Sequence, residues 1–129
     1  MPITLYIVDD HKIFRQGIQS LIGYEEDMEI IGSASSLKEF MEDIPKHQPS
    51  PDLIIMDITL GDGTGTDGVK WWRTQQPESK FLMLSMHREE KYVQAVLKAG
   101  ANGYLLKDAG TKEMMNAIRT VYNLSLIHI

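Results

Sequence analysis

The sequence predicts one α/β domain built on a parallel β-sheet, and three observations lead to this. The chain has 129 residues, of which 43% are hydrophobic, and this size supports a sizeable core without a disulfide or metal. Short apolar runs alternate with longer amphipathic stretches about five times, the pattern of parallel α/β sheets. Residues 3–8 form a continuous β-branched apolar run, which indicates a strand buried on both faces.

Five strands are expected, each followed by a helix. The strands are predicted at residues 3–8, 28–33, 53–56, 81–84 and 103–106. The helices are predicted at residues 11 to about 24, 37 to about 46, 66–76, 88–99 and from about 111 onward. We assign the domain to residues 1–123. Residues 124–129 form an uncharged, mostly apolar tail, which we expect to be a truncation point or non-native residues.

Each helix is predicted from an apolar face and from residues that begin or end helices. Ser36 with Glu39 three positions later has the capping-box spacing, and Gly100 stands where a helix C-cap is expected. Trp71 is expected as an exposed contact beside the core residue Trp72. The residues expected to face the core are Ile13, Phe14, Ile18, Leu21 and Ile22 in the first helix, Val69 and Trp72 in the third, Val93, Val96 and Leu97 in the fourth, and Met114, Ile118 and Val121 in the fifth.

Charge and composition exclude several classes of function. Thirteen basic and 18 acidic residues give a net charge of −5, so direct binding of this chain to nucleic acid is not expected. The chain has no cysteine, which excludes thiolate zinc sites and catalytic thiols and favours a cytoplasmic location. The apolar run at residues 3–8 stops at Asp9 and Asp10, so neither a signal peptide nor contact with a membrane is expected.

Polar residues follow four of the five predicted strands. Asp9 and Asp10 follow the first, Asp57 the third, Ser85 the fourth and Lys107 the fifth. The carboxyl ends of parallel strands meet at one edge of the sheet, where ligands bind. Three carboxylates held together repel, so either one takes up a proton or a cation neutralises them. Mg²⁺ prefers such oxygen ligands, and with a lysine this set suggests transfer of a phosphoryl group to a carboxylate.

At these residues the sequence resembles the receiver domain of two-component response regulators, over residues 1 to about 123. The segments that carry the resemblance are Val8-Asp9-Asp10-His11, Ile55-Met56-Asp57-Ile58, Leu84-Ser85-Met86-His87 and residues 99–109. The first and last of them look most like the subfamily with a C-terminal LuxR-type helix-turn-helix domain, which these 129 residues do not include. The resemblance implies a flavodoxin-like (βα)5 doubly wound parallel sheet in three layers, with strand order 2-1-3-4-5.

The resemblance also implies a role for each residue at the strand ends. Asp57 is the expected acceptor of a phosphoryl group from a sensor histidine kinase. Asp10, Asp57 and the main-chain carbonyl of Thr59 are expected to bind Mg²⁺ directly, and Asp9 through a water molecule. Lys107 is expected to pair with the phosphoryl group.

Further residues are expected to carry the response. Ser85 and Tyr104 form the expected switch, with Ser85 donating to a phosphoryl oxygen and Tyr104 moving into the vacated space. Thr59, Met86 and His87 hold positions that resemble those that tune dephosphorylation.

Two departures from the family pattern have structural consequences. Gly61 stands where many receivers have proline, in a glycine-rich loop that we expect to be more mobile. Asp108 follows Lys107 where other subfamilies have a cis proline, so we expect a trans bond there.

The implied function is a phosphorylation-activated switch and not an enzyme with a separate substrate. It would control a transcriptional output domain through the face of the fourth and fifth helices or of the first and fifth, with a homodimer as one outcome. The kinase is expected to dock near the first helix, including Phe14, Arg15 and Ile18.

Two rival functions are considered. An aspartate-nucleophile phosphatase of the haloacid dehalogenase type uses an Asp-x-Asp motif, whereas Asp57 is followed by Ile58 and Thr59. A pseudo-receiver would bind partners without phosphorylation. The four histidines lack metal-ligand spacing, so zinc is not expected and we interpret them as ordinary surface or loop residues: His11, His47, His87 and His128.

Overall fold

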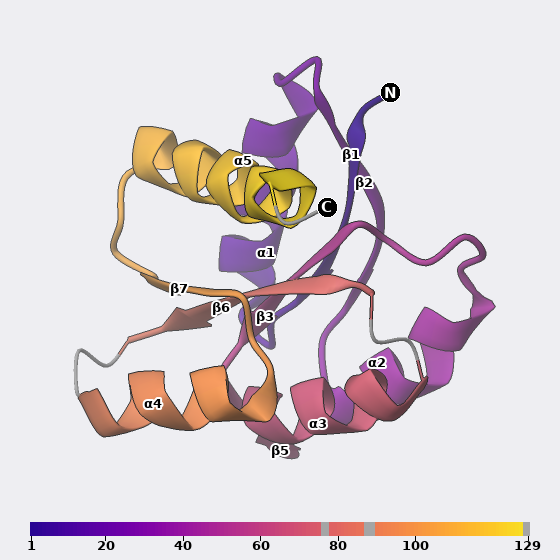
Figure 1. Cartoon of the computed structure of the whole chain (residues 1–129), viewed down its shortest axis with the longest axis vertical. Helices are drawn as coiled ribbons and strands as arrows, with labels where there is room; N and C mark the ends of the chain where they lie inside the picture. Colours follow the sequence, from indigo (N-terminus) through magenta and orange to yellow (C-terminus); the bar gives the residue numbers. More distant parts are fainter. Residues whose placement is uncertain (76–77, 87–89, 128–129) are drawn as a thin grey trace.

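A five-stranded parallel sheet forms the centre of the molecule (Figure 1). The computed structural model describes residues 1–75, 78–86 and 90–127, with the side chains of all these except 90–92 and 124–127. The sheet has the order β2-β1-β3-β6-β7. When only the five strands of this sheet are numbered along the chain, the order is 2-1-3-4-5, which confirms the predicted topology. Its strands are β1 (Ile3–Val8), β2 (Met28–Ala34), β3 (Leu53–Asp57), β6 (Lys80–Ser85) and β7 (Gly103–Leu106).

Helices cover both faces of the sheet, so the predicted three layers are confirmed. Helices α1 and α5 lie on one face, and α2, α3 and α4 lie on the other (Figure 1). The helices are α1 (Lys12–Gly23), α2 (Leu37–Asp43), α3 (Gly65–Gln75), α4 (Glu90–Ala99) and α5 (Thr111–Ile127), and a 3-10 turn, η1 (Ile44–Lys46), extends α2. Helix α5 therefore continues past residue 123, and the domain boundary predicted there stays a prediction.

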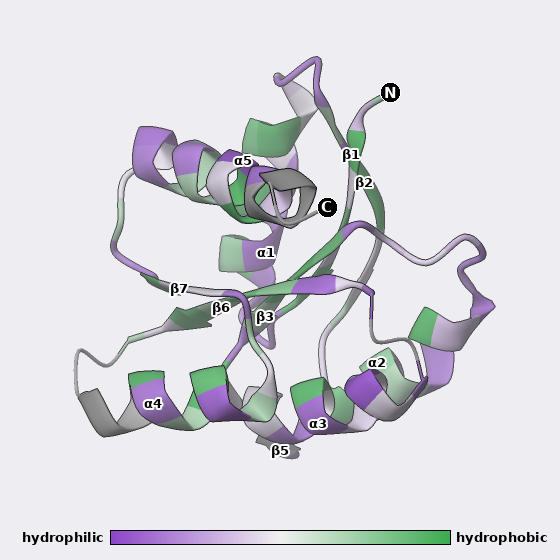
Figure 2. Ribbon diagram, in the orientation of Figure 1, coloured by the Kyte–Doolittle hydropathy of each residue, from purple (hydrophilic) through white to green (hydrophobic). Residues whose placement is uncertain are grey.

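The core consists of two apolar clusters, one on each side of the sheet. Leu5 and Ile7 of β1 belong to the cluster beneath α1 and α5, whereas Tyr6 and Val8 belong to the cluster beneath α2, α3 and α4. Successive side chains of a strand point to opposite faces, so a continuously apolar strand supplies both clusters. Figure 2 shows these apolar strands between helices in which hydrophilic and hydrophobic residues alternate.

The helix caps predicted from the sequence are present. The Ser36 hydroxyl accepts a hydrogen bond from the Glu39 backbone N–H at 3.1 Å. Asp62 adds a cap that the sequence did not indicate, because its carboxylate accepts from the backbone N–H groups of Leu37 and Lys38 at 2.8 and 2.9 Å. The first three N–H groups of α2 are thus all satisfied by side chains.

The C-terminal end of α4 is closed at Gly100, as predicted. Gly100 has a φ of +111°, in the left-handed region that a side chain rarely adopts. Its carbonyl accepts hydrogen bonds from the Arg73 guanidinium at 2.6 and 3.2 Å, and the same guanidinium donates to the Asn102 side chain at 2.8 Å. Helix α3 is thereby tied to the loop before β7.

Three of the predicted inward-facing residues are exposed. Ile13 is 86% exposed, Leu21 37% and Leu97 48%. Ile13 and the buried Ile22 are nine residues apart, which at about 100° per residue places them on opposite sides of a helix. The apolar face of α1 is therefore narrower than predicted and is centred on Ile18 and Ile22.

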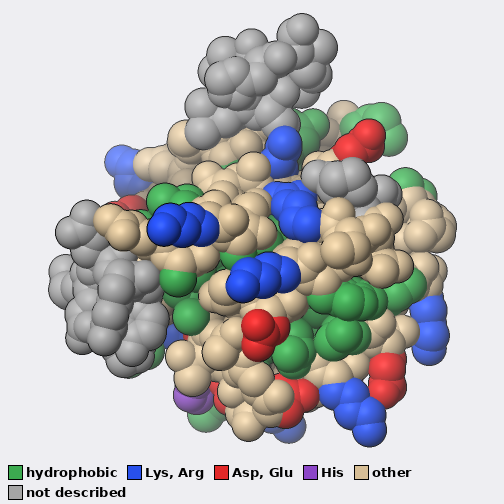
Figure 3. Space-filling model, turned by 60° about the horizontal axis from the view of Figure 1, so that its bottom comes forward, with side chains coloured by type: hydrophobic (Ala, Val, Ile, Leu, Met, Phe, Trp, Pro, Cys, Tyr) green, Lys and Arg blue, Asp and Glu red, His purple; other side chains and the backbone are tan. Residues whose placement is uncertain are grey.

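The glycine-rich loop after β3 forms a short antiparallel hairpin. Its strands are β4 (Thr59–Leu60) and β5 (Gly63–Thr64). Among the described residues, no helix is long and apolar enough to cross a membrane. Figure 3 shows the face covered by α2, α3 and α4, where basic, acidic and apolar side chains are interspersed.

Candidate functional site

The register of the sheet brings the predicted strand-end residues together. Val8 pairs with Met56, so Asp9 follows β1 beside Asp57 at the end of β3. Asp57 in turn pairs with Leu84 in the next strand. The Lys107 backbone N–H donates to the Ser85 carbonyl at 2.9 Å. The carboxyl edge of the sheet thus gathers residues from four strand ends, as the sequence predicted.

A buried lysine lies between two buried aspartates. Lys107 Nζ is 2.8 Å from Asp57 Oδ2 and 2.9 Å from Asp9 Oδ2. Asp9 is fully buried, Asp57 is 3% exposed and Lys107 is 9% exposed. The ammonium also lies 4.7 Å from the centre of the Phe14 ring, a cation–π distance.

Burial and pairing shift the ionisation of this pair. Burial raises the pKa of Asp57 above its usual value, while the Lys107 ammonium and the Thr59 N–H oppose this rise. Burial by itself would lower the pKa of Lys107, but hydrogen bonds to Asp57 and Asp9 outweigh it and raise that pKa. Lys107 therefore holds its proton firmly, and Asp57 is a poorly hydrated carboxylate whose charge depends on that ammonium.

Backbone contacts fix the position of the Asp57 carboxylate. The Thr59 N–H donates to Asp57 Oδ1 at 3.1 Å, which leaves Oδ2 directed toward Lys107. The Gly65 N–H donates to the Ile58 carbonyl at 2.7 Å. A Cβ on Gly65 would lie 2.3 Å from the Asp57 carbonyl oxygen, so this position requires glycine. The sequence did not reveal this requirement, because Gly65 is one of several glycines in the loop.

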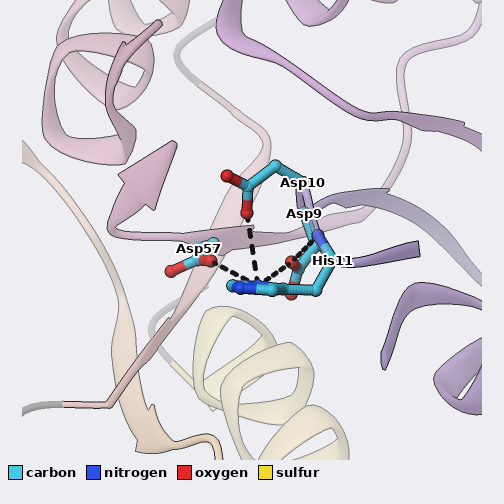
Figure 4. Close-up of side chains that lie close together, drawn as sticks. All are labelled: Asp9, Asp10, His11 and Asp57. Atoms are coloured by element: carbon cyan, nitrogen blue, oxygen red, sulfur yellow. Dashed lines mark hydrogen bonds and ion pairs between the residues drawn. The ribbon is translucent and has the colours of Figure 1, made fainter. Parts of the chain in front are cut away.

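His11 belongs to this site, so the interpretation of it as an ordinary surface residue is wrong. Its Nδ1 lies 3.2 Å from Asp9 Oδ1, 3.3 Å from Asp10 Oδ1 and 3.9 Å from Asp57 Oδ2. Figure 4 shows the ring lying among these three carboxylates. Its proximity to Asp9 and Asp10 in the chain was the available signal, since spacing between histidines alone does not detect a mixed donor set.

The pocket has the donor set of a metal site. Asp9, Asp10, His11 and Asp57 each offer one ligand atom, and these atoms lie within 4.8 Å of one another. A cavity of about 250 Å³ adjoins the site and is lined by Asp10, His11, Asp57, Thr59 and Met86. Three carboxylates face one lysine there, so these residues can hold a divalent cation.

The predicted switch residues lie on the two neighbouring strands β6 and β7. Ser85 is buried at the end of β6 and pairs with Leu106, the residue before Lys107. Tyr104 is half-buried on β7 opposite Met83. Met86 is 72% exposed at the rim of the cavity. His87 lies outside the described residues, as does His128.

The predicted docking residues on α1 differ in accessibility. Ile18 is only 3% exposed but lines the cavity between α1 and the start of α5, and its role as a kinase contact stays a prediction. Phe14 and Arg15 are half-buried, and the Arg15 guanidinium donates to the Asp9 carbonyl at 2.5 Å. Ile13 and Leu21 are the exposed apolar side chains of this helix.

Known proteins with this arrangement were found by sequence and by structure. The oxygen regulatory protein NreC of Staphylococcus haemolyticus is 35% identical over 121 residues, which cover 93% of this chain and 55% of that protein. The transcriptional regulatory protein DegU of Brevibacillus brevis is 34% identical over 119 residues, which cover 92% of this chain and 50% of that protein. The chain thus spans about half the length of these relatives.

A solved structure shows the same fold. The LuxR-family two-component response regulator from Aurantimonas sp. SI85-9A1 superposes with a TM-score of 0.88 at 25% identity, covering 95% of this chain and 86% of that one. The model of the response regulator receiver domain matches residues 5–119. From the sequence match and the shared fold, we conclude that this chain belongs to the family of response regulator receiver domains, of the type found in LuxR-family regulators.

Proposed function

We propose that Asp57 accepts a phosphoryl group from a phosphohistidine of a sensor histidine kinase. The observation that carries this proposal is the position of the Asp57 carboxylate, held between the Lys107 ammonium and the Thr59 N–H at the floor of an acidic cavity. A carboxylate in this place is oriented and poorly hydrated, which favours nucleophilic attack.

In the transfer, a carboxylate oxygen of Asp57 attacks the phosphorus atom. A new P–O bond forms as the P–N bond breaks, and the imidazole nitrogen of the donor keeps the electron pair. Lys107 stays protonated and pairs with a phosphoryl oxygen, while Asp9 keeps the ammonium in place. Mg²⁺ bound through Asp10, Asp57 and the Thr59 carbonyl, with Asp9 acting through water, would neutralise charge on the phosphoryl oxygens.

The response is proposed to pass through Ser85 and Tyr104. Ser85 would donate its hydroxyl to a phosphoryl oxygen, and Tyr104 would move inward and change the surface of β7 and its neighbouring helices. Thr59, Met86 and His87 are proposed to set how fast water removes the phosphoryl group. The domain would thus catalyse only its own phosphorylation and slow dephosphorylation, in the cytoplasm.

The partners are proposed from family membership and the surface of α1. A cavity of about 270 Å³ lies between α1 and the start of α5, and Ile13 and Leu21 are exposed on its α1 side. A kinase helix would place its apolar face there. The output would be transcriptional, through a DNA-binding domain such as the LuxR-type module, and a homodimer is one form of the phosphorylated protein.

Intact-mass spectrometry after incubation with acetyl phosphate and Mg²⁺ tests this function. We expect one phosphoryl adduct on the wild-type protein, none on Asp57→Asn and none when EDTA is present. A wild-type protein without an adduct, and without a spectral change on adding beryllofluoride and Mg²⁺, would instead favour a pseudo-receiver that only binds partners.

A further inference from the structure

We infer that His11 is a metal ligand of this site through Nδ1, so that the site prefers a borderline divalent cation such as Co²⁺ over Mg²⁺. The inference rests on the proposed function, because it concerns the cation that accompanies phosphorylation of Asp57. His11 would add a nitrogen donor to a site whose other ligands are all oxygen atoms. This donor would change which divalent cation the pocket binds most tightly.

The spacing of the donor atoms supports this assignment. In an octahedral site with bonds of about 2.1 Å, neighbouring ligand atoms lie about 3 Å apart. His11 Nδ1 lies 3.2 Å from Asp9 Oδ1 and 3.3 Å from Asp10 Oδ1, with Asp57 Oδ2 at 3.9 Å. The nitrogen is thus one of four donor atoms that lie within 4.8 Å of one another, and Figure 4 shows it among the three carboxylates.

The contact with Lys107 indicates that Nδ1 carries the lone pair that a metal ligand needs. Lys107 Nζ lies 3.0 Å from Nδ1, and an ammonium can only donate, so the Nδ1 lone pair accepts this hydrogen bond. A cation bound among the carboxylates would take over that lone pair. Lys107 keeps Asp57 and Asp9 as its partners.

The backbone holds the imidazole at the pocket. The His11 N–H donates to Asp9 Oδ1 at 2.8 Å, and His11 is the N-cap residue of α1 in an extended conformation. The backbone of His11 is therefore held close to Asp9. Its side chain is 64% exposed, so presenting Nδ1 to a cation costs little desolvation.

The nitrogen donor of His11 distinguishes transition-metal cations from Mg²⁺. Imidazole nitrogen is a good ligand for first-row transition metals, whose affinity rises from Mn²⁺ through Co²⁺ to Ni²⁺ and Cu²⁺. Mg²⁺ prefers hard oxygen ligands and retains water, so it gains little from the nitrogen. The carboxylates attract Mg²⁺ and Co²⁺ alike by charge, whereas the His11 nitrogen stabilises bound Co²⁺ but adds little for Mg²⁺.

Metal titrations of tag-free protein test the inference without any phosphoryl donor. Affinities for Mg²⁺ and Co²⁺ are measured by calorimetry on the wild type, on His11→Gln and on His47→Gln. His47 is the matched control because it pairs with Asp43 away from the pocket. We expect the wild type to bind Co²⁺ at least about tenfold more tightly than Mg²⁺. His11→Gln should lose about tenfold in Co²⁺ affinity and less than about twofold in Mg²⁺ affinity, and His47→Gln should lose neither.

Proton NMR of the Co²⁺ complex supplies a second measurement. A ligating imidazole gives strongly shifted ring signals, and these should vanish in His11→Gln and persist in His47→Gln. If His11→Gln weakens both ions equally, or neither, the inference is overturned. If the metal titrations give such a result and the protein still forms the Asp57 adduct with Mg²⁺, the proposed function stands. Only the assignment of His11 as a metal ligand is then rejected.

Discussion

Lys107 is the single residue on which the charge balance of the pocket depends. Its ammonium contacts both buried carboxylates, Asp9 and Asp57, at 2.9 and 2.8 Å. Among the described residues it is the lysine or arginine that forms ion pairs with these two oxygens. Breaking a buried ion pair leaves an uncompensated charge, which costs far more than the loss of a surface pair.

Replacing this lysine should destabilise the protein. Lys107→Met keeps the length of the side chain and removes the charge, and we expect the free energy of unfolding at pH 7 in EDTA to fall by about 3 kcal/mol. Urea denaturation measures this free energy. Lys112→Met is the control because Lys112 is exposed, and its unfolding free energy is expected to lie within about 0.5 kcal/mol of the wild-type value. Equal stability of both variants would mean that the aspartates do not need the ammonium.

At the residue scale, the strand-end rule predicted most of the site. Asp9, Asp57, Ser85 and Lys107 each end or follow an apolar strand, and parallel strands bring such residues to one edge. His11 was missed because the spacing between histidines does not detect a mixed set of donors, and its ring meets Asp57 only in the folded structure.

At the scale of elements, a polar cluster joins β1 to the end of α2. The Tyr6 hydroxyl donates to Asp43 Oδ2 at 2.8 Å, and His47 Nε2 lies 3.0 Å from the same oxygen. The hydrogen bonds from Tyr6 and then from His47 hold the pKa of Asp43 below its usual value, and burial raises the pKa of Tyr6, which stays neutral. The cluster therefore stabilises the fold while Asp43 is charged.

This contact predicts a pH-dependent loss of stability. A carboxyl whose pKa is lowered on folding stabilises the protein above its unfolded pKa, and the contribution disappears as the pH falls through the folded value. Tyr6→Phe should lower the unfolding free energy by about 1 kcal/mol at pH 7, since Asp43 is partly exposed. The difference from wild type should shrink below pH of about 4.

Denaturation curves from pH 3 to 7 measure this effect, and Tyr24→Phe is the control because Tyr24 is 84% exposed. If the difference in unfolding free energy between Tyr6→Phe and wild type is constant over this pH range, the charge of Asp43 does not contribute to the stability that Tyr6 provides.

The elements themselves were predicted better than their surfaces. All five strands of the main sheet start within one residue of the expected positions, because continuous apolar runs bounded by polar residues leave little freedom. The face of α1 was predicted too broadly, since Ile13 and Leu21 are apolar but lie on the exposed side of the helix, and single exposed apolar side chains are common. The Asp62 cap on α2 joins residues 24 and 25 positions apart, beyond the reach of a local capping pattern.

At the scale of the whole molecule, the acidic pocket predicts that stability depends on divalent cations. Three carboxylates and one lysine share the pocket, and the chain as a whole carries a net charge of −5. A cation that binds only the folded state stabilises it by about 1.4 kcal/mol at ten times its dissociation constant. The unfolded chain separates the carboxylates and lacks the site.

Mg²⁺ at ten times its dissociation constant should therefore raise the unfolding free energy of the wild type by about 1.4 kcal/mol. The gain should be smaller in Asp10→Asn, which removes a charged donor at the exposed side of the pocket. Urea denaturation at constant ionic strength, with KCl replacing MgCl₂, measures the difference. An equal gain in both proteins would place the stabilising ion elsewhere.

We expect Asp57 to be the one aspartate that receives the phosphoryl group, and the position of the adduct in the sequence decides this. Borohydride reduces an acyl phosphate to an alcohol, which marks the modified aspartate in a peptide map. After phosphorylation with acetyl phosphate and Mg²⁺, we expect the reduced residue at position 57 and unmodified carboxylates at Asp9 and Asp10. Reduction at either of these two residues, or at none of the three, would mean that Asp57 is not the acceptor.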